Sequence, residues 1–441
     1  MRLLRVGLST ARPLLSIAGG FGVVALSGYA FVLVVARWPE AATRAALTSF
    51  YFLAITVLLG VAVGLDQATN RRVALALAQG ERLGPILRDW ARRVAMIAAV
   101  LGGLLLALSW LIVPRSLHGD VAIFGTLLLG LMAAVTVAVV RGVLAGAQQT
   151  TAYAANWSIE GLSRLALLAV VALAGRPAAW VLALVYVLPY GLSALAAVGR
   201  VRRIVAGAAT AAPVPTASAD PVRTGLVALV TAALLTNAAT NLPQLVLGVR
   251  EVQDAAAVAT MAQIFVVSRL VLMTISPVQA VLTPRFTAAV ARGDATGMHR
   301  ALRSIVLLCL AVGALWLIVL AVLGPWLLHR LFGATEHTLP IFLGVGAGTS
   351  LLLIGYVLQP ALVALGEFRK VAVAWAWGAG FTAAIAALPW VQPRTAAVVA
   401  ALVGPLFIVV LMGRHLAGAE RAVAIPPAEL PETLDPARSG T

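Results

Sequence analysis

Residues 121–140 read VAIFGTLLLGLMAAVTVAVV, a run without a single charged side chain. About 20 apolar residues is the length that an α-helix needs to cross the hydrocarbon core of a bilayer. The whole chain of 441 residues is 61% hydrophobic and 11% charged, with a mean hydropathy of +1.00. Soluble globular domains carry roughly a quarter of charged residues. The composition therefore excludes a soluble enzyme and predicts an all-α polytopic membrane protein.

Further runs of this kind predict twelve transmembrane helices along the chain. Their expected ranges are 14–36, 46–65, 94–113, 121–140, 161–175, 178–199, 225–248, 255–283, 304–328, 338–362, 371–390 and 395–413. The stretch VRRIVAGAATAAPVPTASADPVR is rich in Ala, Pro, Ser and Thr and separates six helices from six. We therefore expect an N-terminal six-helix lobe at 1–200, a cytoplasmic linker at 201–223, a C-terminal six-helix lobe at 224–415 and a disordered cytoplasmic tail at 416–441.

The net charge of +16 comes from 32 basic and 16 acidic residues, and the basic ones divide unequally between the two sides of the membrane. If the N-terminus is cytoplasmic, seven lie in outer loops: Arg37, Arg44, Arg115, Arg176, Arg250, Arg330 and Arg394. Apart from Arg269, the other 24 lie inside, among them Arg141 and Arg164. The positive-inside rule then predicts a multi-pass protein of the plasma (inner) membrane with both termini cytoplasmic. This bias explains the basic charge without a nucleic-acid partner.

Membrane lipids are expected partners of the basic inner loops. Arg88, Arg92 and Arg93 form a belt at the level of the lipid headgroups, which could gather lipid phosphates. The alternative is that these arginines only set the topology and make generic lipid contacts.

Motifs of soluble catalysis are missing from the sequence. The chain has no phosphate-binding Gly-rich loop of the Walker type, so ATP is not expected to be the direct energy source. Its single cysteine, Cys309, lies in an apolar run, and its five histidines show no spacing suited to a metal. We expect no cofactor, no metal and no enzymatic activity.

Arg269 is the one charge that the expected helices place near the middle of the membrane, in the run QIFVVSRLVLMTIS. All sixteen acids are expected in loops or at helix ends, and Asp66 and Glu160 come nearest to a span. A charge at the bilayer centre costs at least about 2.5–3.5 kcal/mol, so such residues face a cavity or a partner. Arg269 is thus interpreted either as a ligand for an anionic substrate group or as a structural arginine bonded to carbonyls.

A polar stripe is expected beside Arg269. Asn237, Asn241 and Gln244 follow one another at spacings of four and three, which places them on one face of a helix. Gln263 precedes Arg269 by six residues and lies roughly on the same side of its helix. These five residues are the candidate substrate-binding residues, suited to a hydrophilic cavity that handles sugar hydroxyls. The alternative is that the amides only join neighbouring helices by hydrogen bonds.

Three segments carry a resemblance to a known superfamily: GLDQATNRRVALALAQGE (64–81), RGVLAGAQQTTAYAANWSIEGLSRL (141–165) and PVQAVLTPRFTAAVARGD (277–294). Together with twelve helices in two parallel halves, they resemble the superfamily of multidrug and toxin extruders, polysaccharide flippases and lipid II flippases. Within it, the chain resembles the bacterial polysaccharide (O-antigen-type) flippase branch over roughly residues 14–415.

The resemblance implies a fold of two six-helix lobes around a central cavity that opens alternately to the two sides of the membrane. It implies a flippase or exporter that moves an isoprenoid-pyrophosphate-linked oligosaccharide from the cytoplasmic to the outer leaflet, for cell-surface polysaccharide biosynthesis. Arg269 is the position that fits the pyrophosphate-binding arginines of such flippases. Cell-envelope polymerisation machinery is an expected partner beside the lipid-linked oligosaccharide.

Three alternatives remain open. Lipid II-type peptidoglycan precursor flippases usually have fourteen spans, against twelve expected here. Cation-coupled multidrug exporters of the superfamily place an acid within the membrane, and no such acid is expected in this chain. An integral-membrane glycosyltransferase or polymerase would need acidic residues in a sizeable outer loop, and the outer loops here are short.

Overall fold

The computed structural model describes residues 2–38, 40–175, 177–208, 222–274, 286, 295–333 and 339–424. These residues form helices joined by short turns, without a strand. The first half of the chain contains α1 (Arg2–Ala36), α2 (Ala41–Ala54), η1 (Ile55–Leu59), α3 (Gly60–Ala78), α4 (Leu83–Ala107), α5 (Ser109–Leu111), η2 (Ile112–Ser116), α6 (Val121–Gly146), α7 (Thr150–Ala174) and α8 (Ala179–Ala208). The second half contains α9 (Val222–Arg250), α10 (Ala255–Ser268), η3 (Leu270–Thr274), α12 (Ala295–Leu327), η4 (Leu328–Phe332), α13 (Leu339–Ala364), α14 (Phe368–Ala386) and α15 (Pro393–Ala424).

Eleven helical segments of the described residues are long and apolar enough to cross a membrane. The elements α2, η1 and α3 join into one such segment, and α4, α5 and η2 into another. The twelfth expected helix, at 371–390, corresponds to α14 but is not among the eleven. The all-α polytopic fold predicted from composition is confirmed.

The helices are longer than the apolar windows that predict them. The helix expected at 161–175 begins at Thr150, and the one expected at 46–65 belongs to a segment that runs over Ala41–Ala78. The reason is that a charge-free window measures the thickness of the hydrocarbon core, whereas the helix continues wherever its polar side chains find partners. The helix expected at 255–283 differs in the other direction, because α10 ends at Ser268.

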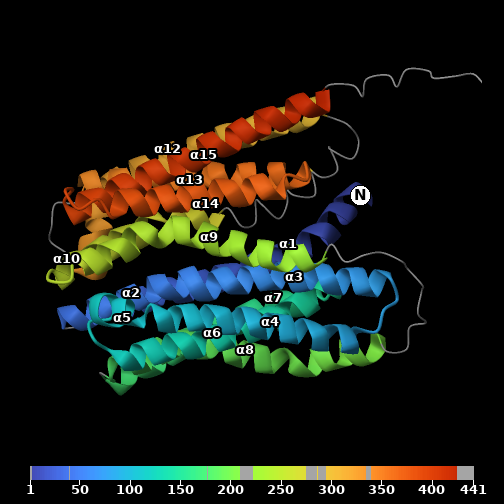
Figure 1. Ribbon diagram of the computed structural model, residues 1–441, viewed down its shortest axis with the longest axis horizontal. Coiled ribbons are helices and arrows are strands. Elements are labelled where there is room, and N and C mark those ends of the chain that lie inside the picture. Colours follow the sequence, from blue (N-terminus) through green and yellow to red (C-terminus); the bar gives the residue numbers. More distant parts are fainter. Residues whose placement is uncertain are drawn as a thin grey trace, which may run out of the picture.

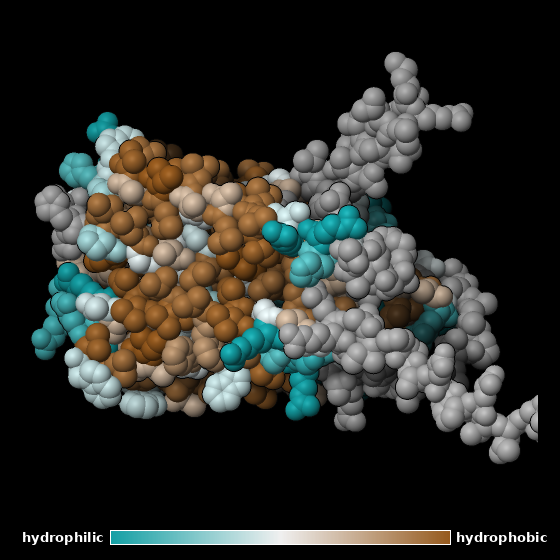
Figure 2. All heavy atoms as spheres, turned by 90° about the horizontal axis from the view of Figure 1, so that it is seen from above, coloured by the Kyte–Doolittle hydropathy of each residue, from teal (hydrophilic) through white to brown (hydrophobic). Residues whose placement is uncertain are grey.

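Two groups of helices lie side by side. Figure 1 shows α12–α15 gathered above α9 and α10, with α2–α8 below them and the start of α1 rising beside one end of α9. The apolar side chains form a broad band on the face seen in Figure 2, and hydrophilic residues border this band. This is the surface expected of a bundle whose outer helices face lipid.

Two of the close contacts between the two groups involve a glycine. On one side, a Cβ added to Gly64 of α3 would lie 2.5 Å from the Cα of Val230 in α9. On the other side, a Cβ added to Gly248 of α9 would lie 3.2 Å from Oγ of Ser49 in α2. We call these the α3–α9 seam and the α2–α9 seam. A glycine allows close approach at both seams, to the backbone of α9 at the first and to a side chain of α2 at the second.

Helical structure also extends into the segments expected to lie between and after the lobes. The helix α8 continues to Ala208 and α9 begins at Val222, so part of the expected linker 201–223 is helical. The helix α15 continues to Ala424, so the first part of the expected tail 416–441 is helical rather than disordered. Residues 209–221 and 425–441 lie outside the described residues, as does most of the third resembling segment, 277–294.

Candidate functional site

Arg269 follows the last residue of α10 and is held by two neutral groups of α9. Its Nη1 donates to Oδ1 of Asn241 at 2.9 Å, and its Nη2 donates to the carbonyl oxygen of Thr240. Its Nε is buried and has no hydrogen-bond partner. The guanidinium forms no salt bridge within the described part of the chain. A partly buried cation of this kind keeps capacity for an anionic partner, because charged acceptors bond a guanidinium more strongly than neutral ones.

Aromatic rings from both groups of helices surround this guanidinium. Its Cζ lies 4.6 Å from the ring centre of Phe265 in α10 and 5.8 Å from that of Phe52 in α2. Tyr29 of α1 and Tyr356 of α13 lie close enough to interact with it electrostatically. Arg269 therefore lies between the two groups, and a movement of one group against the other would change its surroundings. The sequence placed Arg269 halfway along a helix; the structure corrects this to the C-terminal end of α10.

The other predicted residues lie on α9 and α10, but only Asn241 bonds Arg269 directly. Gln244 donates through Nε2 to the carbonyl oxygen of Val258 and so joins α9 to α10 at 3.1 Å. Asn237 donates to a carbonyl of its own helix. The Oε1 atoms of Gln244 and Gln263 are buried without a partner. Unpartnered buried atoms of this kind on two adjacent helices are unusual, since buried polar groups are nearly always bonded.

The order of contacts along α9 places this site between the two seams. Val230 lies at the α3–α9 seam and Gly248 at the α2–α9 seam, while Thr240 and Asn241, which hold Arg269, lie between them in the sequence of the same helix. Arg269 is thus bonded to the part of α9 that lies between the two seams.

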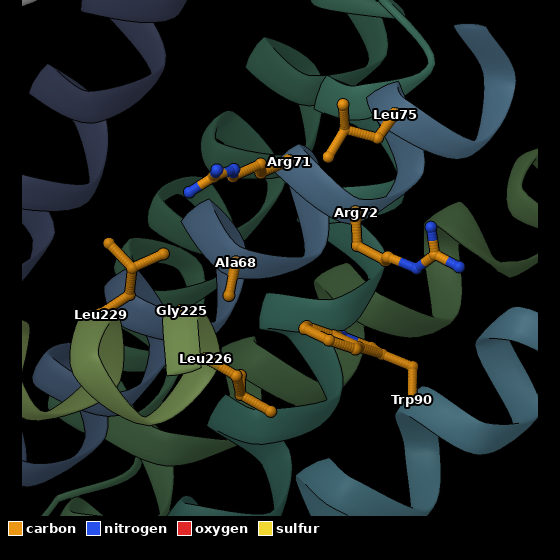
Figure 3. Close-up of a pocket in the computed structure, with 8 residues that line it drawn as sticks. All are labelled: Ala68, Arg71, Arg72, Leu75, Trp90, Gly225, Leu226 and Leu229. Carbon is orange, nitrogen blue, oxygen red and sulfur yellow. The ribbon is translucent and has the colours of Figure 1, made fainter. Parts of the chain in front are cut away.

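A small pocket lies next to the α3–α9 seam, between α3, α4 and α9 (Figure 3). It has a volume of about 20 Å³, room for a single water molecule. Its lining residues are Ala68, Arg71, Arg72, Leu75, Trp90, Gly225, Leu226 and Leu229. In Figure 3, Arg71 and Arg72 leave α3 in opposite directions. Arg72 pairs with Glu81 at 3.1 Å. Since residues of α3, α4 and α9 line the pocket, it is part of the packing between the groups.

A second charged cluster, which the sequence analysis did not foresee, lies inside the first group of helices. Glu160 of α7 is fully buried and bonds two arginines: its Oε2 accepts from Arg141 of α6 at 2.6 Å, and its Oε1 accepts from Arg164 of α7 at 3.0 Å. Arg141 also bonds Asn156, and Arg164 also bonds Ser27 of α1. We call these residues the Glu160 cluster. It joins α1, α6 and α7 through side-chain hydrogen bonds.

Asp66 is a further buried acid, located in α3. It is 8% exposed and accepts a hydrogen bond from the hydroxyl of Tyr153 in α7 at 2.8 Å. No salt bridge of Asp66 is found in the described residues. The expectation that every acid lies in a loop or at a helix end is therefore wrong for Asp66 and Glu160. Arg141 and Arg164, which the sequence analysis places among the inner arginines, are both buried within helices, in α6 and α7.

A periodic signal could have revealed the Glu160 cluster. Asn156, Glu160 and Arg164 recur at intervals of four, which places them on one face of a single helix. The predicted helix start at 161 divided this set. Among the described residues, no group of three or more His, Cys, Asp or Glu is placed to hold a metal ion.

Comparison with known proteins identifies the fold. No protein-family model matches the chain, and no curated protein matches it. The inward-facing structure of a multidrug resistance MATE family transporter of the MOP superfamily superposes with a TM-score of 0.70, at 14% identity, over 93% of this chain and 99% of that one. The chain has the MATE transporter fold.

Further solved structures with the MATE fold agree. An outward-facing MATE family transporter of the MOP superfamily gives a TM-score of 0.64, at 13% identity, over 93% of this chain and 96% of that one. A MOP superfamily transporter from Pyrococcus furiosus, described as having a binding pocket of reverse polarity, gives 0.64 at 12% identity, over 93% and 95%. The superfamily fold implied by the sequence motifs is confirmed. The polysaccharide flippase branch stays a prediction.

Proposed function

We propose that this protein is a flippase that moves an isoprenoid-pyrophosphate-linked oligosaccharide across the plasma membrane by alternating access. The observation that carries the proposal is Arg269, a guanidinium between the two groups of helices that is bonded to neutral acceptors and has an unpaired Nε. A pyrophosphate offers charged oxygens to this guanidinium. These oxygens would replace Asn241 and Thr240 as the acceptors of its N–H groups.

The polar residues beside Arg269 suit the rest of such a substrate. The unpaired Oε1 atoms of Gln244 and Gln263 can accept hydrogen bonds from sugar hydroxyls. Aromatic rings such as Phe52 and Phe265 offer apolar faces for stacking against sugar rings. The site would thus replace the water lost by the polar headgroup, whose transfer through the bilayer without partners costs several kcal/mol per group.

Alternating access would work through the two seams. Opening the α3–α9 seam would admit the headgroup from one side, and opening the α2–α9 seam would release it on the other. The MATE fold is known from inward-facing and outward-facing structures, and this chain is similar to both. In the structure both seams are in close contact.

The proposal is tested in proteoliposomes loaded with a fluorescent polyprenyl-pyrophosphate oligosaccharide. A quencher that cannot cross the bilayer measures exchange of this lipid between leaflets. We expect lipid exchange with the native protein and an exchange rate at least tenfold lower with Arg269→Ala. The variant Arg269→Lys should recover part of this rate, because it keeps the positive charge but loses the planar set of N–H donors of the guanidinium. The control is Arg115→Gln, which removes an exposed arginine of η2.

Native exchange that persists in Arg269→Ala would remove Arg269 from the mechanism. Absence of exchange with the native protein for several glycolipids would overturn the flippase assignment itself.

A cation-coupled multidrug exporter is the second candidate, favoured by Asp66. The sequence argument against it was the absence of an acid within the membrane, and the structure removes that argument. Asp66 is buried in a helix with the Tyr153 hydroxyl as its hydrogen-bond partner, so it could exchange a cation. Proton- or sodium-driven efflux of a cationic dye that is lost in Asp66→Asn, without glycolipid exchange, would establish this function instead.

Orientation and partners follow the same proposal. The positive-inside rule predicts that both termini are cytoplasmic, so transport would run from the cytoplasmic leaflet to the outer one. The transported glycan would be consumed on the outer side, and cell-envelope polymerisation machinery is the proposed partner there.

A further inference from the structure

Each of the two most exposed spans carries near its start two arginines that form no salt bridge with the described residues. The segments Leu83–Ser116 and Gly297–Phe332 each have only 17% of their apolar window buried, the lowest share among the eleven candidate spans. They contain α4 and α12, which are the third helical segments of the first and second groups. Their outer faces therefore meet lipid over most of their length.

On α4, one exposed ridge combines two arginines with three apolar side chains. Arg88 and Arg92 are exposed and are followed at intervals of four by Met96, Val100 and Leu104, which are 63%, 70% and 53% exposed. Residues four apart on a helix lie one above the other on one face. The opposite face, which includes Trp90, Val94 and Ala98, is buried against the bundle. The ridge therefore points away from the protein.

The charges of Arg88 and Arg92 are not neutralised by nearby acids. Asp89 pairs with Arg93 at 2.9 Å, and Glu81 pairs with Arg72 at 3.1 Å. No salt bridge of Arg88 or Arg92 is found in the described residues. Two like charges four residues apart on a helix repel each other, and an anion placed between them removes this repulsion.

The dimensions fit one leaflet of a bilayer. Arg92 and Leu104 are separated by about 18 Å along the helix axis, at about 1.5 Å per residue. One leaflet contributes about half of the roughly 30 Å hydrocarbon core. A phosphate held at the arginines would thus place an acyl chain along the three apolar side chains.

The helix α12 repeats this pattern. Arg300 and Arg303 are exposed near its start and precede Leu307 and Leu310, which are 55% and 49% exposed. No salt bridge of either arginine is found in the described residues. Figure 2 shows, on the face that it presents, hydrophilic residues bordering the apolar band.

We propose that the Arg88–Arg92 ridge of α4 and the Arg300–Arg303 ridge of α12 each bind an anionic phospholipid, with the phosphate between the two guanidiniums and an acyl chain along the apolar residues that follow. The two sites would anchor the peripheral helix of each group to the same leaflet. Charge complementarity selects the anionic headgroup, and the exposed apolar ridge selects a lipid over a soluble phosphate.

The test counts bound lipids on the purified full-length protein by native mass spectrometry, with dioleoyl phosphatidylglycerol and dioleoyl phosphatidylcholine as probes. We expect phosphatidylglycerol to bind more tightly, and the double variant R88Q/R92Q to weaken this binding about 30-fold at one site, as two arginines near an anionic headgroup imply. The variant R300Q/R303Q should weaken the second site equally. The matched control is R202Q/R203Q, which removes the same charge from exposed positions on α8.

The outcomes separate the proposal from its alternatives. An equal loss in R202Q/R203Q would mean that only the total surface charge matters. Equal binding of phosphatidylcholine would mean that only the apolar ridge matters. Competition by soluble glycerol phosphate at similar affinity would indicate a phosphate site rather than a lipid site. Each of these results would overturn the proposal, and unchanged melting temperatures of the variants would show that folding is not the cause.

Discussion

Replacing Glu160 by glutamine should destabilise the first group of helices strongly without changing its shape. The carboxylate has almost no exposed surface and bonds Arg141 at 2.6 Å and Arg164 at 3.0 Å. Glutamine has the same size, so no cavity forms, but it can accept from only one arginine and presents an N–H donor to the other. Two buried guanidiniums then lack a counter-charge.

The expected magnitude follows from the burial of both partners. Removing one partner of a buried ion pair costs about 3–5 kcal/mol of unfolding free energy, because the remaining charge stays desolvated. An exposed pair contributes about 0–1 kcal/mol. The pair of Arg93 and Asp89 supplies this comparison, since their side chains are 30% and 58% exposed. We therefore expect Glu160→Gln to cost several times more than Asp89→Asn.

The assay is equilibrium unfolding of the purified protein in mixed micelles with increasing SDS, followed by tryptophan fluorescence. A further variant, Arg141→Met, retains the bond between Glu160 and Arg164 and should cost less than Glu160→Gln. Unfolding free energies of Glu160→Gln and Asp89→Asn that agree to within about 1 kcal/mol would refute the reasoning. So would a larger loss in Arg141→Met than in Glu160→Gln.

Three further predictions concern close packing and hydrogen bonding. The variant Gly64→Ala should lower the transport rate, because the added methyl group obstructs closure of the α3–α9 seam. The control Gly103→Ala adds a methyl group in open space on α4 and should leave the rate unchanged in the same vesicle assay. Tyr153→Phe leaves the buried Asp66 without its hydroxyl donor and should cost about 1–3 kcal/mol in SDS unfolding, and an unchanged midpoint would contradict this. In Gly348→Ala the new methyl group would collide with the carbonyl of Ala401, so α13 and α15 must separate, and we expect a lower melting temperature in detergent.

The sequence predicts the fold well because apolar length is a local property. Windows without charge locate the helices, since every span must satisfy its backbone inside lipid. They fail at α7, whose polar face of Asn156, Glu160 and Arg164 finds partners on α1, α6 and α8 that no local window contains. The pairing of these partners depends on the register between helices distant in the sequence.

The candidate site is partly predictable for a related reason. A lone arginine in an apolar run indicates Arg269, and helical spacing places Asn241 on the polar face of its neighbour. Their contact at 2.9 Å and the end of α10 at Ser268 depend on how α9 packs against α10, which the sequence does not reveal. The aromatic rings of α2 enter the site only because the two groups of helices meet there.

Arg164 and Arg269 differ in how completely they are bonded, and this difference separates fixed from available charge. Arg164 donates to a carboxylate, a carbonyl and a hydroxyl through its three nitrogens, so its charge is neutralised and its position is set. Arg269 donates to an amide and a carbonyl, and its Nε has no acceptor. A ligand anion would gain little by competing with Glu160 for Arg164, whereas at Arg269 it would replace neutral acceptors by charged ones. Anion binding between the two groups is therefore expected at Arg269, while the Glu160 cluster keeps the first group rigid enough for the seams to open and close as units.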